Sequence, residues 1–469
     1  PFLLVLVLVA CARSPNATAP TSAPAAPAGT AVTSRTPTGP PATSQLLPPA
    51  ASTATSVRGT PAQRTTAATP PADNRGCPPG IDLLGYSDTL DKTTFAGNAI
   101  GGLSALVYDP AHDRYYSLVD NQGDTPARFY TLRLPLDGGR LGTPETIAVT
   151  ILRRPDGEPY TGRTLDGEGM ALLPDGDLLI ASETEPSIRR FAPDGRQRGQ
   201  LPVPPRFLVK PNGEAGENLT FESLALAPDG LTLYTAVEGP LGPDGFATPV
   251  RARLRLLRYT ANPTYQPTAQ FFYLTETAQG LSEIAALGPD ELLTLERGFI
   301  PGLGNTIRLF RVSLTGATDV TARPSLADPA LTPVPKTLLL DLGLCTPGTA
   351  RHPGKQSNPL LDNIESVALG PLLPDGRQTL LLQSDDNFAA DQVTRFYALA
   401  FRPKAFFLTP SRPNRRRYSY ARSAGGNWFS PAEYREKWSS NRSSAPPTAC
   451  AARNITAWRS ASRSASYLG

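Results

Sequence analysis

"LDGEGMALLPDGDLLIASE", residues 165–183, contains the pattern that decides the fold: an apolar run, a Pro-Asp-Gly turn and a second apolar run. Two short apolar runs joined by such a turn predict a β-hairpin. The hairpin also carries an acidic residue near each end, Glu168 and Glu183. Buried strands are ordinarily apolar, so these two acids are the first candidates for a functional role.

The same hairpin recurs along the chain, at residues 103–120, 221–238, 281–296 and 364–385. In all five copies a proline follows the lead residue by six positions, and the second run closes on an acid. The lead residues are Ser104, Glu168, Glu222, Glu283 and Glu365, and the closing acids are Asp120, Glu183, Glu238, Glu296 and Asp385. Successive lead residues are 64, 54, 61 and 82 positions apart, which is within or somewhat above the range for propeller blades.

Further short apolar runs between the hairpins give each repeat room for four strands, which is one blade of a β-propeller. We therefore predict an all-β propeller with five four-stranded repeats, and a sixth, more degenerate blade stays open. The last repeat offers only three strands. The stretch "IDLLGYSDTL" at residues 81–90 is expected to supply the fourth and close the ring.

The lead residue begins one strand and the closing acid ends its antiparallel partner, so both lie at the same end of the hairpin. If the first strand lines the central channel, the acids surround one mouth of it. Each acid alone is simply explained as a strand-end cap, but the set is not, because close like charges repel by about 4 kcal/mol per pair at an intermediate dielectric. Bound cations, raised pKa values or nearby basic side chains must offset this repulsion.

Other chemistries find little support in the sequence. There is no G-x-S-x-G motif, phosphate-binding loop or dinucleotide fingerprint, and the two histidines, His112 and His352, fall in a turn and a loop. The scarcity of His and Cys argues against zinc or copper, whereas many carboxylates favour Ca²⁺.

The two ends of the chain differ in composition from the hairpin region. Residues 1–11, PFLLVLVLVAC, form an apolar run too short to span a bilayer, and they predict a secretory signal that ends in a bacterial lipobox with Cys11 as the lipidated residue. An ordinary signal with a chance cysteine is the alternative. Residues 12–76 are rich in Ala, Pro, Thr and Ser, which predicts a disordered tether. Both readings of the first eleven residues predict export from the cytoplasm, and the lipobox reading predicts a bacterial cell-envelope lipoprotein, periplasmic or on the cell surface.

The tail, residues 404–469, carries 12 Lys/Arg, only two acids and all three tryptophans. Such a tail could bind nucleic acid or anionic lipid, but it shows no apolar periodicity, and we favour a disordered or out-of-frame extension. The expected globular body is residues 77–403. Within it, Cys77 and Cys345 can pair in an oxidising compartment, although spacing alone does not show that they approach one another.

The body resembles a known family. The stretches "GGLSALVYDP", "LDGEGMALLPDGDLLIASE", "NLTFESLALAPDG", "LLTLERGF", "DNIESVAL" and "LQSDDNF" are similar to the bacterial phytase-like family, described as having esterase-like activity of phytase, over residues 101–400. The resemblance implies a secreted or lipid-anchored propeller distantly similar to calcium-dependent propeller phytases. The acids that match the family's motifs are Glu168, Glu222, Glu283 and Glu365, with Glu296-Arg297 and Asp385-Asp386-Asn387 at strand ends.

Together these observations favour a calcium-dependent hydrolase of phosphoric esters that acts on a small anionic substrate. The expected catalytic residues are Glu168, Glu365 and Arg297, with Arg297 binding transition-state charge. The expected metal ligands are Asp120, Glu168, Glu222, Glu283, Glu365, Asp385 and Asp386. We expect a monomer that contacts the membrane only through its lipid anchor and does not bind nucleic acid. The alternative is a non-catalytic, surface-tethered propeller that binds a glycan or a protein.

Overall fold

A computed structural model describes residues 76–402, apart from Pro79 and Gln122. The predicted signal and lipobox with Cys11, nearly all of the predicted tether and the basic tail lie outside the described residues. Within this described range, no helix has the length and apolar character needed to cross a membrane.

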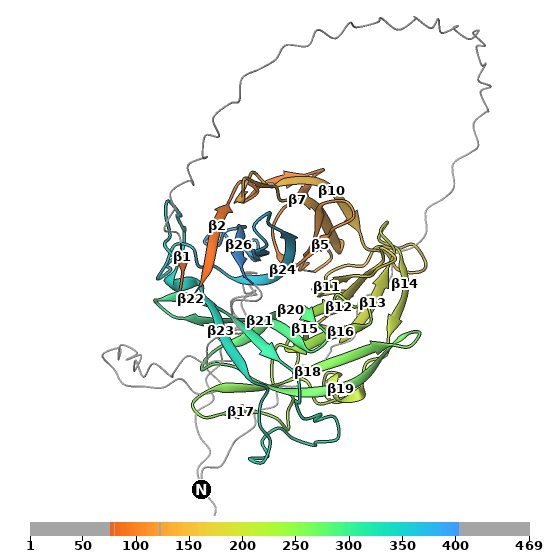
Figure 1. The fold of residues 1–469 in the computed structure, drawn as a ribbon. Coiled ribbons are helices and arrows are strands. Elements are labelled where there is room, and N and C mark those ends of the chain that lie inside the picture. Colours follow the sequence, from red (N-terminus) through yellow and green to blue (C-terminus); the bar gives the residue numbers. More distant parts are fainter. Residues whose placement is uncertain (1–75, 79, 122, 403–469) are drawn as a thin grey trace, which may run out of the picture. The chain divides into compact units, whose positions relative to one another are not determined.

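Five antiparallel sheets are arranged around a centre (Figure 1), and each is one blade. Blade 1 consists of β5 (Leu103–Asp109), β6 (Arg114–Val119), β7 (Arg128–Arg133) and β10 (Glu145–Ile151). Blade 2 consists of β11 (Gly167–Leu172), β12 (Leu178–Ser182), β13 (Ser187–Phe191) and β14 (Gln197–Leu201). Blade 3 consists of β15 (Phe221–Leu226), β16 (Thr232–Val237), β18 (Arg251–Ala261) and β19 (Tyr265–Leu274), with β17 (Phe246–Ala247) also paired to β18.

Blade 4 consists of β20 (Gly280–Gly288), β21 (Glu291–Ile300), β22 (Gly304–Ser313) and β23 (Lys336–Asp341). Blade 5 consists of β24 (Ile364–Leu372), β25 (Gln378–Ser384), β26 (Phe396–Phe401), β2 (Ile81–Ser87) and β1 (Gly76–Cys77). Two small ribbons, β3 (Thr94–Phe95) with β4 (Asn98–Ala99) and β8 (Leu136–Asp137) with β9 (Arg140–Leu141), and two 3₁₀ turns, η1 (Pro205–Phe207) and η2 (Leu342–Leu344), complete the described part. The prediction of a five-bladed propeller is confirmed, and the described chain forms no sixth blade.

The first strand of each hairpin is the innermost strand of its blade. Strands β5, β11, β15, β20 and β24 each contact the next around the centre, and β24 returns to β5. Apolar clusters fill the space between neighbouring blades; one of them joins Tyr116 and Phe129 of blade 1 to Ile180 and Phe191 of blade 2. The ring is thus held by sheet-on-sheet packing.

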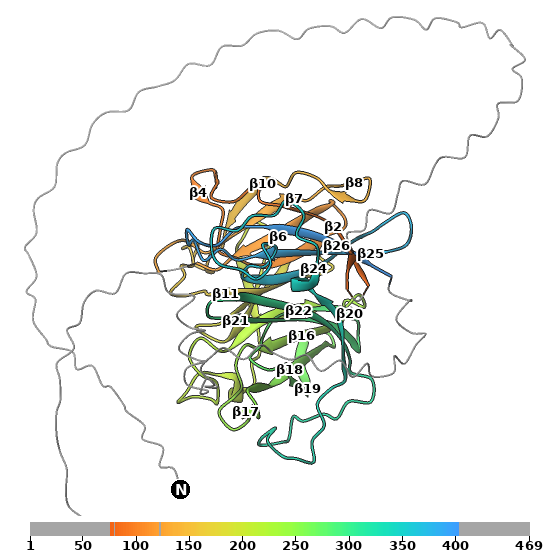
Figure 2. The same cartoon turned by 90° about the vertical axis from the view of Figure 1, so that its left-hand side faces the viewer.

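The N-terminal strand closes the ring, as the sequence predicts. β2 pairs with β26 along Asp82↔Ala400 to Ser87↔Phe396, and the side view in Figure 2 shows blade 1 in orange beside blade 5 in blue. Cys77 of β1 forms a disulfide with Cys345, just after η2, with Cα atoms 4.3 Å apart. This bond ties the first described strand to the segment that leads from blade 4 into blade 5.

Candidate active site

A β-bulge lies near the start of every inner strand. The register shifts fall between Leu103/Ala105, Gly167/Gly169, Phe221/Ser223, Leu281/Glu283 and Ile364/Ser366. The bulged residues are therefore Ser104, Glu168, Glu222, Ser282 and Glu365. A bulge leaves one residue out of the ladder and re-aims its side chain, so a polar group can begin an otherwise apolar strand.

Blade 4 is out of step with the repeat pattern by one residue. Its bulged residue is Ser282 rather than Glu283, because Leu281 pairs with Glu296 and Gly280 pairs with Arg297. A second register shift, between Ala286 and Gly288, absorbs the extra residue before the turn and preserves the six-position spacing to proline. The sequence alignment of Glu283 with Glu168 is thus not the structural one.

The same shift changes which residue closes the hairpin. In the other blades the backbone N–H of the closing acid donates a hydrogen bond to the backbone carbonyl of the residue just before the inner strand. The donor and acceptor pairs are Asp120 and Gly102, Glu183 and Asp166, Glu238 and Thr220, and Asp385 and Asn363. In blade 4 the equivalent position holds Arg297, opposite Gly280. A basic residue therefore stands where each of the other four blades has an acid.

Glu296 lies away from these closing residues. It accepts hydrogen bonds from the Tyr273 hydroxyl at 2.5 Å and the Glu276 backbone N–H at 2.8 Å, and it pairs with Lys336. Burial raises the pKa of Glu296, while the charge of Lys336 opposes that rise. Glu296 thus joins blade 4 to β19 of blade 3.

Five carboxylates from blades 1 to 3 form what we call the acidic layer: Asp120, Asp166, Glu168, Glu183 and Glu222. They make two groups of three, and within each group one oxygen per residue lies within 4.8 Å of the others. The first group is Asp120, Asp166 and Glu168, and the second is Glu168, Glu183 and Glu222. Glu168 belongs to both groups, so it links two neighbouring sets of oxygen donors.

The acidic layer is more buried than the open channel mouth expected from the sequence. Relative exposure is 8% for Asp120, 2% for Glu168 and Glu222, and 0% for Glu183, while Asp166 is half-buried. The backbone N–H of Thr220 reaches Glu183 at 3.3 Å, which fixes blade 3 against blade 2 at this level. These residues offer only carboxylate oxygens, a donor set that suits a hard divalent cation such as Ca²⁺.

Arg297 and Glu365 form a buried ion pair on the opposite arc of the ring. Arg297 Nη2 lies 3.0 Å from Glu365 Oε1, and its Nε lies 3.3 Å from the Ser282 hydroxyl. The side-chain amide of Asn363 donates to the same carboxylate at 3.1 Å. Arg297, singled out in the sequence as a catalytic candidate, is therefore oriented by Glu365 and by the bulged serine of its own blade.

Glu283 occupies the next level along the inner strands. It accepts the Ile284 backbone N–H at 2.9 Å. Burial raises the pKa of Glu283 well above its usual range; the backbone N–H groups of Ile284 and Leu224 oppose that rise, and the charges of Glu222 and Glu365 add to it. The pKa of Glu283 is thus affected by one carboxylate of the acidic layer, Glu222, and by the carboxylate that pairs with Arg297, Glu365.

The two consecutive aspartates of blade 5 have separate surroundings. Asp386 accepts the backbone N–H groups of Gly102 at 2.9 Å and Phe388 at 3.1 Å, and it pairs with Lys92. Asp385 accepts the Asn387 backbone N–H at 2.6 Å and holds the closing position of its blade. Asp386 therefore joins blade 5 to the start of blade 1. Neither Asp385 nor Asp386 belongs to the two carboxylate groups of the acidic layer.

Sequence reasoning left two acidic-layer residues out of the predicted ligand set. The repeat pattern marks Glu183 only as a closing acid, and it does not mark Asp166. The available signal was the spacing in "LDGEG", which puts Asp166 and Glu168 on either side of Gly167. What the sequence does not show is that the chain before Gly167 brings Asp166 within reach of Asp120 on the neighbouring blade.

The histidines do not supply a free general base beside a serine. His352 uses both ring nitrogens, towards the Gly354 carbonyl and Asp362, each at 3.0 Å. Burial opposes protonation of His352, but the hydrogen bond and charge of Asp362 outweigh it and raise its pKa. His112 is mostly exposed, and its Nδ1 lies 2.8 Å from Asp109.

A five-bladed propeller with a buried layer of carboxylates defines the class of protein. The family model of phytase-like proteins, described as esterase-like activity of phytase, matches residues 98–388. The chain belongs to this family, as the sequence motifs indicated. No functionally curated protein matches it.

Solved structures share only distant similarity with this chain. Hydrazine synthase of Kuenenia stuttgartiensis has 11% identity and a TM-score of 0.31, covering 67% of this chain and 68% of its own. The PQQ-bound aldose sugar dehydrogenase of Streptomyces coelicolor has 16% identity and a TM-score of 0.28, covering 64% of this chain and 80% of its own. A protein of unknown function from Bacteroides caccae has 9% identity and a TM-score of 0.27, covering 61% of this chain and 72% of its own.

Proposed function

We propose that this protein is a calcium-dependent hydrolase of phosphoric esters and that the acidic layer holds the metal. The observation that carries the proposal is that Glu168 belongs to two three-carboxylate groups built from neighbouring blades. The family description, esterase-like activity of phytase, supports ester hydrolysis as the reaction class. A small anionic ester is the substrate class that a bound cation would favour.

The electrostatics of the layer support a bound cation. Three carboxylates with oxygens within 4.8 Å repel one another strongly in a site that is largely shielded from water. A divalent ion converts this repulsion into attraction, and hard oxygen donors in this number are those that Ca²⁺ prefers. Asp120, Asp166 and Glu168 would hold one ion, and Glu168, Glu183 and Glu222 a second.

Each part of the chain has a distinct role in the proposed reaction. When bound, calcium supplies positive charge for the anionic ester and lowers the pKa of a nearby water. Glu168, which belongs to both three-carboxylate groups, would keep the two ions next to each other. Glu365, oriented by Arg297 and Asn363, positions the attacking water or takes its proton. The guanidinium of Arg297 stabilises the negative charge that develops on the phosphoryl oxygens.

The cellular setting is also part of the proposal. We propose an exported lipoprotein of the bacterial cell envelope, anchored through Cys11 and monomeric, with no role for nucleic acid. The disulfide between Cys77 and Cys345 supports an oxidising compartment.

The burial of the layer favours a second candidate, a non-catalytic propeller. If ions in the acidic layer only stabilise the ring, the protein is a surface-tethered module whose exposed faces bind a glycan or a protein. A fold by itself does not decide between an enzyme and a binding module.

Calcium titration with an activity assay separates the two candidates. The full chain is stripped with a chelator and titrated with Ca²⁺ while thermal unfolding and p-nitrophenol release from p-nitrophenyl phosphate are followed. The hydrolase predicts an unfolding midpoint that rises with free Ca²⁺, and turnover that rises with it. Glu168→Gln should lose both responses, and Glu365→Gln should lose turnover.

Exposed Glu158 provides the matched control, since Glu158→Gln makes the same chemical change outside the site. A rising midpoint without turnover on phosphate esters would favour the binding module. A thermal unfolding midpoint that does not change with free Ca²⁺ would contradict the metal assignment.

A further inference from the structure

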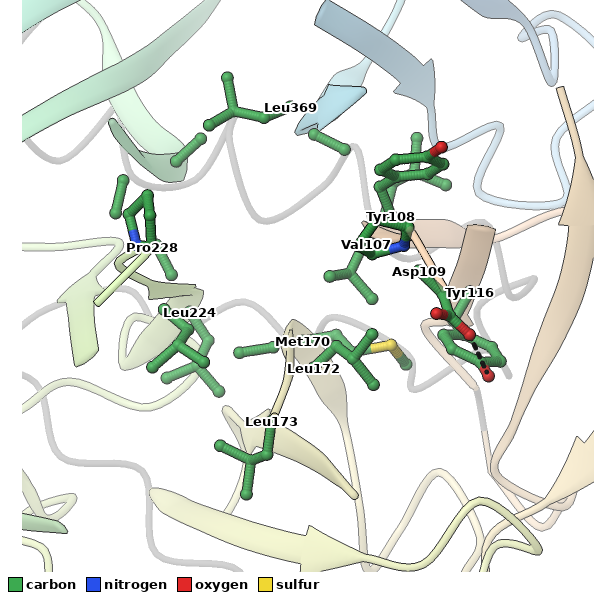
Figure 3. Close-up of a pocket in the computed structure, with 18 of the residues that line it drawn as sticks. Val107, Tyr108, Asp109, Tyr116, Met170, Leu172, Leu173, Leu224, Pro228 and Leu369 are labelled. Carbon is green, nitrogen blue, oxygen red and sulfur yellow. Dashed lines mark hydrogen bonds between the residues drawn. The ribbon is translucent and has the colours of Figure 1, made fainter. Parts of the chain in front are cut away.

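The chain contains two histidines, and each contacts an aspartate in different surroundings. His112 contacts Asp109 on the lining of a central cavity of about 720 Å³. Figure 3 shows Asp109 at this cavity, together with apolar lining residues such as Met170, Leu172 and Leu224. The side chain of His112 is 62% exposed, so water solvates the ring in either protonation state. His112 therefore needs no particular protonation state to fit the fold.

His352 is buried, and both of its ring nitrogens face acceptors. Its side chain is 3% exposed, and Nδ1 and Nε2 lie 3.0 Å from the Gly354 carbonyl and from Asp362 Oδ2. Asp362 also accepts the backbone N–H groups of Val393 at 2.6 Å and Asn363 at 2.7 Å, so both of its oxygens act as acceptors. A carbonyl cannot donate, and a neutral imidazole carries only one N–H. The contacts therefore match the doubly protonated, positively charged ring.

Two charged residues from the blades act on His352. Asp362, just before β24, contacts the ring directly, whereas Arg395, just before β26, is paired with Asp88 at 2.8 Å. Burial lowers the pKa of His352, and the charge of Arg395 adds to this effect. The hydrogen bond and charge of Asp362, with the Gly354 carbonyl, outweigh both and raise it. The surroundings thus favour the charged form of the ring.

His352 belongs to a stretch without helix or strand, residues 351–357, which we call the strap. Side chains alternate along it: Arg351, Pro353, Lys355 and Ser357 are exposed, and His352, Gly354 and Gln356 are half-buried. Gln356 accepts the backbone N–H of Asn305 at 2.7 Å, and the Arg351 carbonyl accepts a hydrogen bond from Arg395 at 2.6 Å. Of these contacts and the contact of His352 with Asp362, only the last depends on a proton that histidine exchanges near neutral pH.

The chain on either side of the strap is fixed. Before it, Cys345 is held by the disulfide to Cys77. After it, Leu360 and Leu361 are buried in the apolar cluster between blades 4 and 5. A segment with few contacts between two fixed ends can open locally while the rest of the ring stays folded.

The strap lies at the end of blades 4 and 5 that holds the Arg297–Glu365 pair. Asn305, which the strap contacts, pairs in the sheet with Phe299, and Phe299 is two residues after Arg297. Asp362, the partner of His352, is three residues before Glu365. Opening of the strap would therefore release chain directly beside this ion pair.

We propose that the strap opens and closes with pH: it is fastened to Asp362 while His352 is protonated, and it opens when the ring loses a proton. A neutral ring leaves one nitrogen as an acceptor that faces another acceptor, at Gly354 or at Asp362. Such an unmade hydrogen bond at a buried site is unfavourable, and the strap has few other contacts to offset it. The proposal does not depend on a bound metal or on the proposed hydrolase activity.

The direction of the pH dependence follows from the raised pKa of His352. The folded protein keeps this proton at pH values where the unfolded chain has lost it. The contribution of His352 is therefore full below its ordinary pKa of about 6.5 and declines as pH rises through the higher folded pKa. The strap is thus closed in acid and opens in alkali.

Hydrogen exchange of the full chain tests the proposal, with chelator present so that metal occupancy is the same throughout. After correction for the intrinsic pH dependence of exchange, amides of the strap should exchange at least about threefold faster at about pH 9 than at about pH 6, while β12 stays unchanged. His352→Gln should remove this difference, because the amide does not titrate. His112→Gln makes the same change at the exposed histidine and should keep it.

Equal exchange of the strap at the two pH values in the native chain would overturn the proposal. The same pH response in His352→Gln would overturn it as well, because the response would then come from another group.

A second measurement covers the case in which His352→Gln fails to fold. NMR of the histidine side chains resolves only two rings, and His112→Gln identifies the signal of His352. His352 should carry protons on both nitrogens at about pH 6.5 and lose one at higher pH. A neutral His352 ring at about pH 6.5 would contradict the proposed contact with Asp362.

Discussion

The hairpins β11–β12 and β20–β21 carry the same sequence pattern and end up with opposite chemistry. In the first, the bulge and the closing position hold Glu168 and Glu183; in the second they hold Ser282 and Arg297. One residue of register separates the two cases. Because side chains alternate along a strand, such a shift reverses which residues face the centre, and it turns a pair of acids into a serine and an arginine.

The difference gives the ring two unequal arcs. The arc of blades 1 to 3 has five carboxylates in two overlapping groups of three, with oxygens within 4.8 Å in each group, whereas the arc of blades 4 and 5 has an arginine paired with Glu365. A propeller with five identical hairpins would have crowded acids all the way round. Blade 4 breaks that symmetry and supplies a cation from the protein itself.

Among the variants that test this difference between the two arcs, Arg297→Met is expected to change the free energy of unfolding the most. It leaves Glu365 buried without its arginine, and loss of one partner of a buried pair costs about 3–5 kcal/mol. Urea unfolding of the full chain measures this change in the free energy of unfolding. Adding Glu365→Gln should recover part of the loss because the stranded charge is removed. A loss below about 1 kcal/mol for Arg297→Met would show that the pair contributes little to blade 4.

Glu183→Gln and Glu296→Gln sharpen the comparison at the closing positions. The sequence pattern makes them equivalent, but only Glu183 belongs to the acidic layer. At free Ca²⁺ one hundred times its dissociation constant, the native chain should gain about 2.7 kcal/mol, and Glu183→Gln should lose most of that gain. Glu296→Gln should keep it. Thermal unfolding with and without chelator checks both variants, and the same calcium response in both would contradict the structural register.

Glu296→Gln should still lower stability by about 2 kcal/mol without any calcium dependence. The amide keeps the shape of the carboxylate but weakens charge-assisted contacts with Lys336 and the Glu276 N–H. Urea unfolding in the presence of chelator isolates this contribution. A stability equal to that of the native chain would mean that the contacts between blade 4 and β19 are dispensable.

Glu283→Gln is expected to cause the smallest change. The change should be in how the free energy of unfolding varies with pH. The raised pKa means that folded Glu283 keeps its proton at pH values where the unfolded chain has lost it. Its contribution to stability is therefore full below about pH 4 and declines as pH rises towards the folded pKa. The amide cannot titrate, so the variant should show a flatter stability curve between pH 5 and 8, taken as an approximate working range. Superimposable curves for the two proteins would refute the assignment.

Much of the fold could be predicted because it rests on local patterns. Two apolar runs joined by a proline-containing turn mark each hairpin, and five repeats leave few architectures other than a propeller. The closing strand β2 was predictable because the last repeat lacked one strand. The register of blade 4 was not predictable, because the second shift between Ala286 and Gly288 leaves the spacing to Pro289 intact.

The sequence by itself determined the propeller, its five blades and a set of acids at one end of the inner hairpins, since strand periodicity and turn chemistry are local properties of the chain. The tertiary structure decided how those acids are grouped. It brings Asp166 of the segment before β11 to Asp120 of blade 1 and places Arg297 beside Glu365. These outcomes depend on bulges and on contacts between blades, which come from pairing and packing across the ring and leave no periodic trace in the sequence.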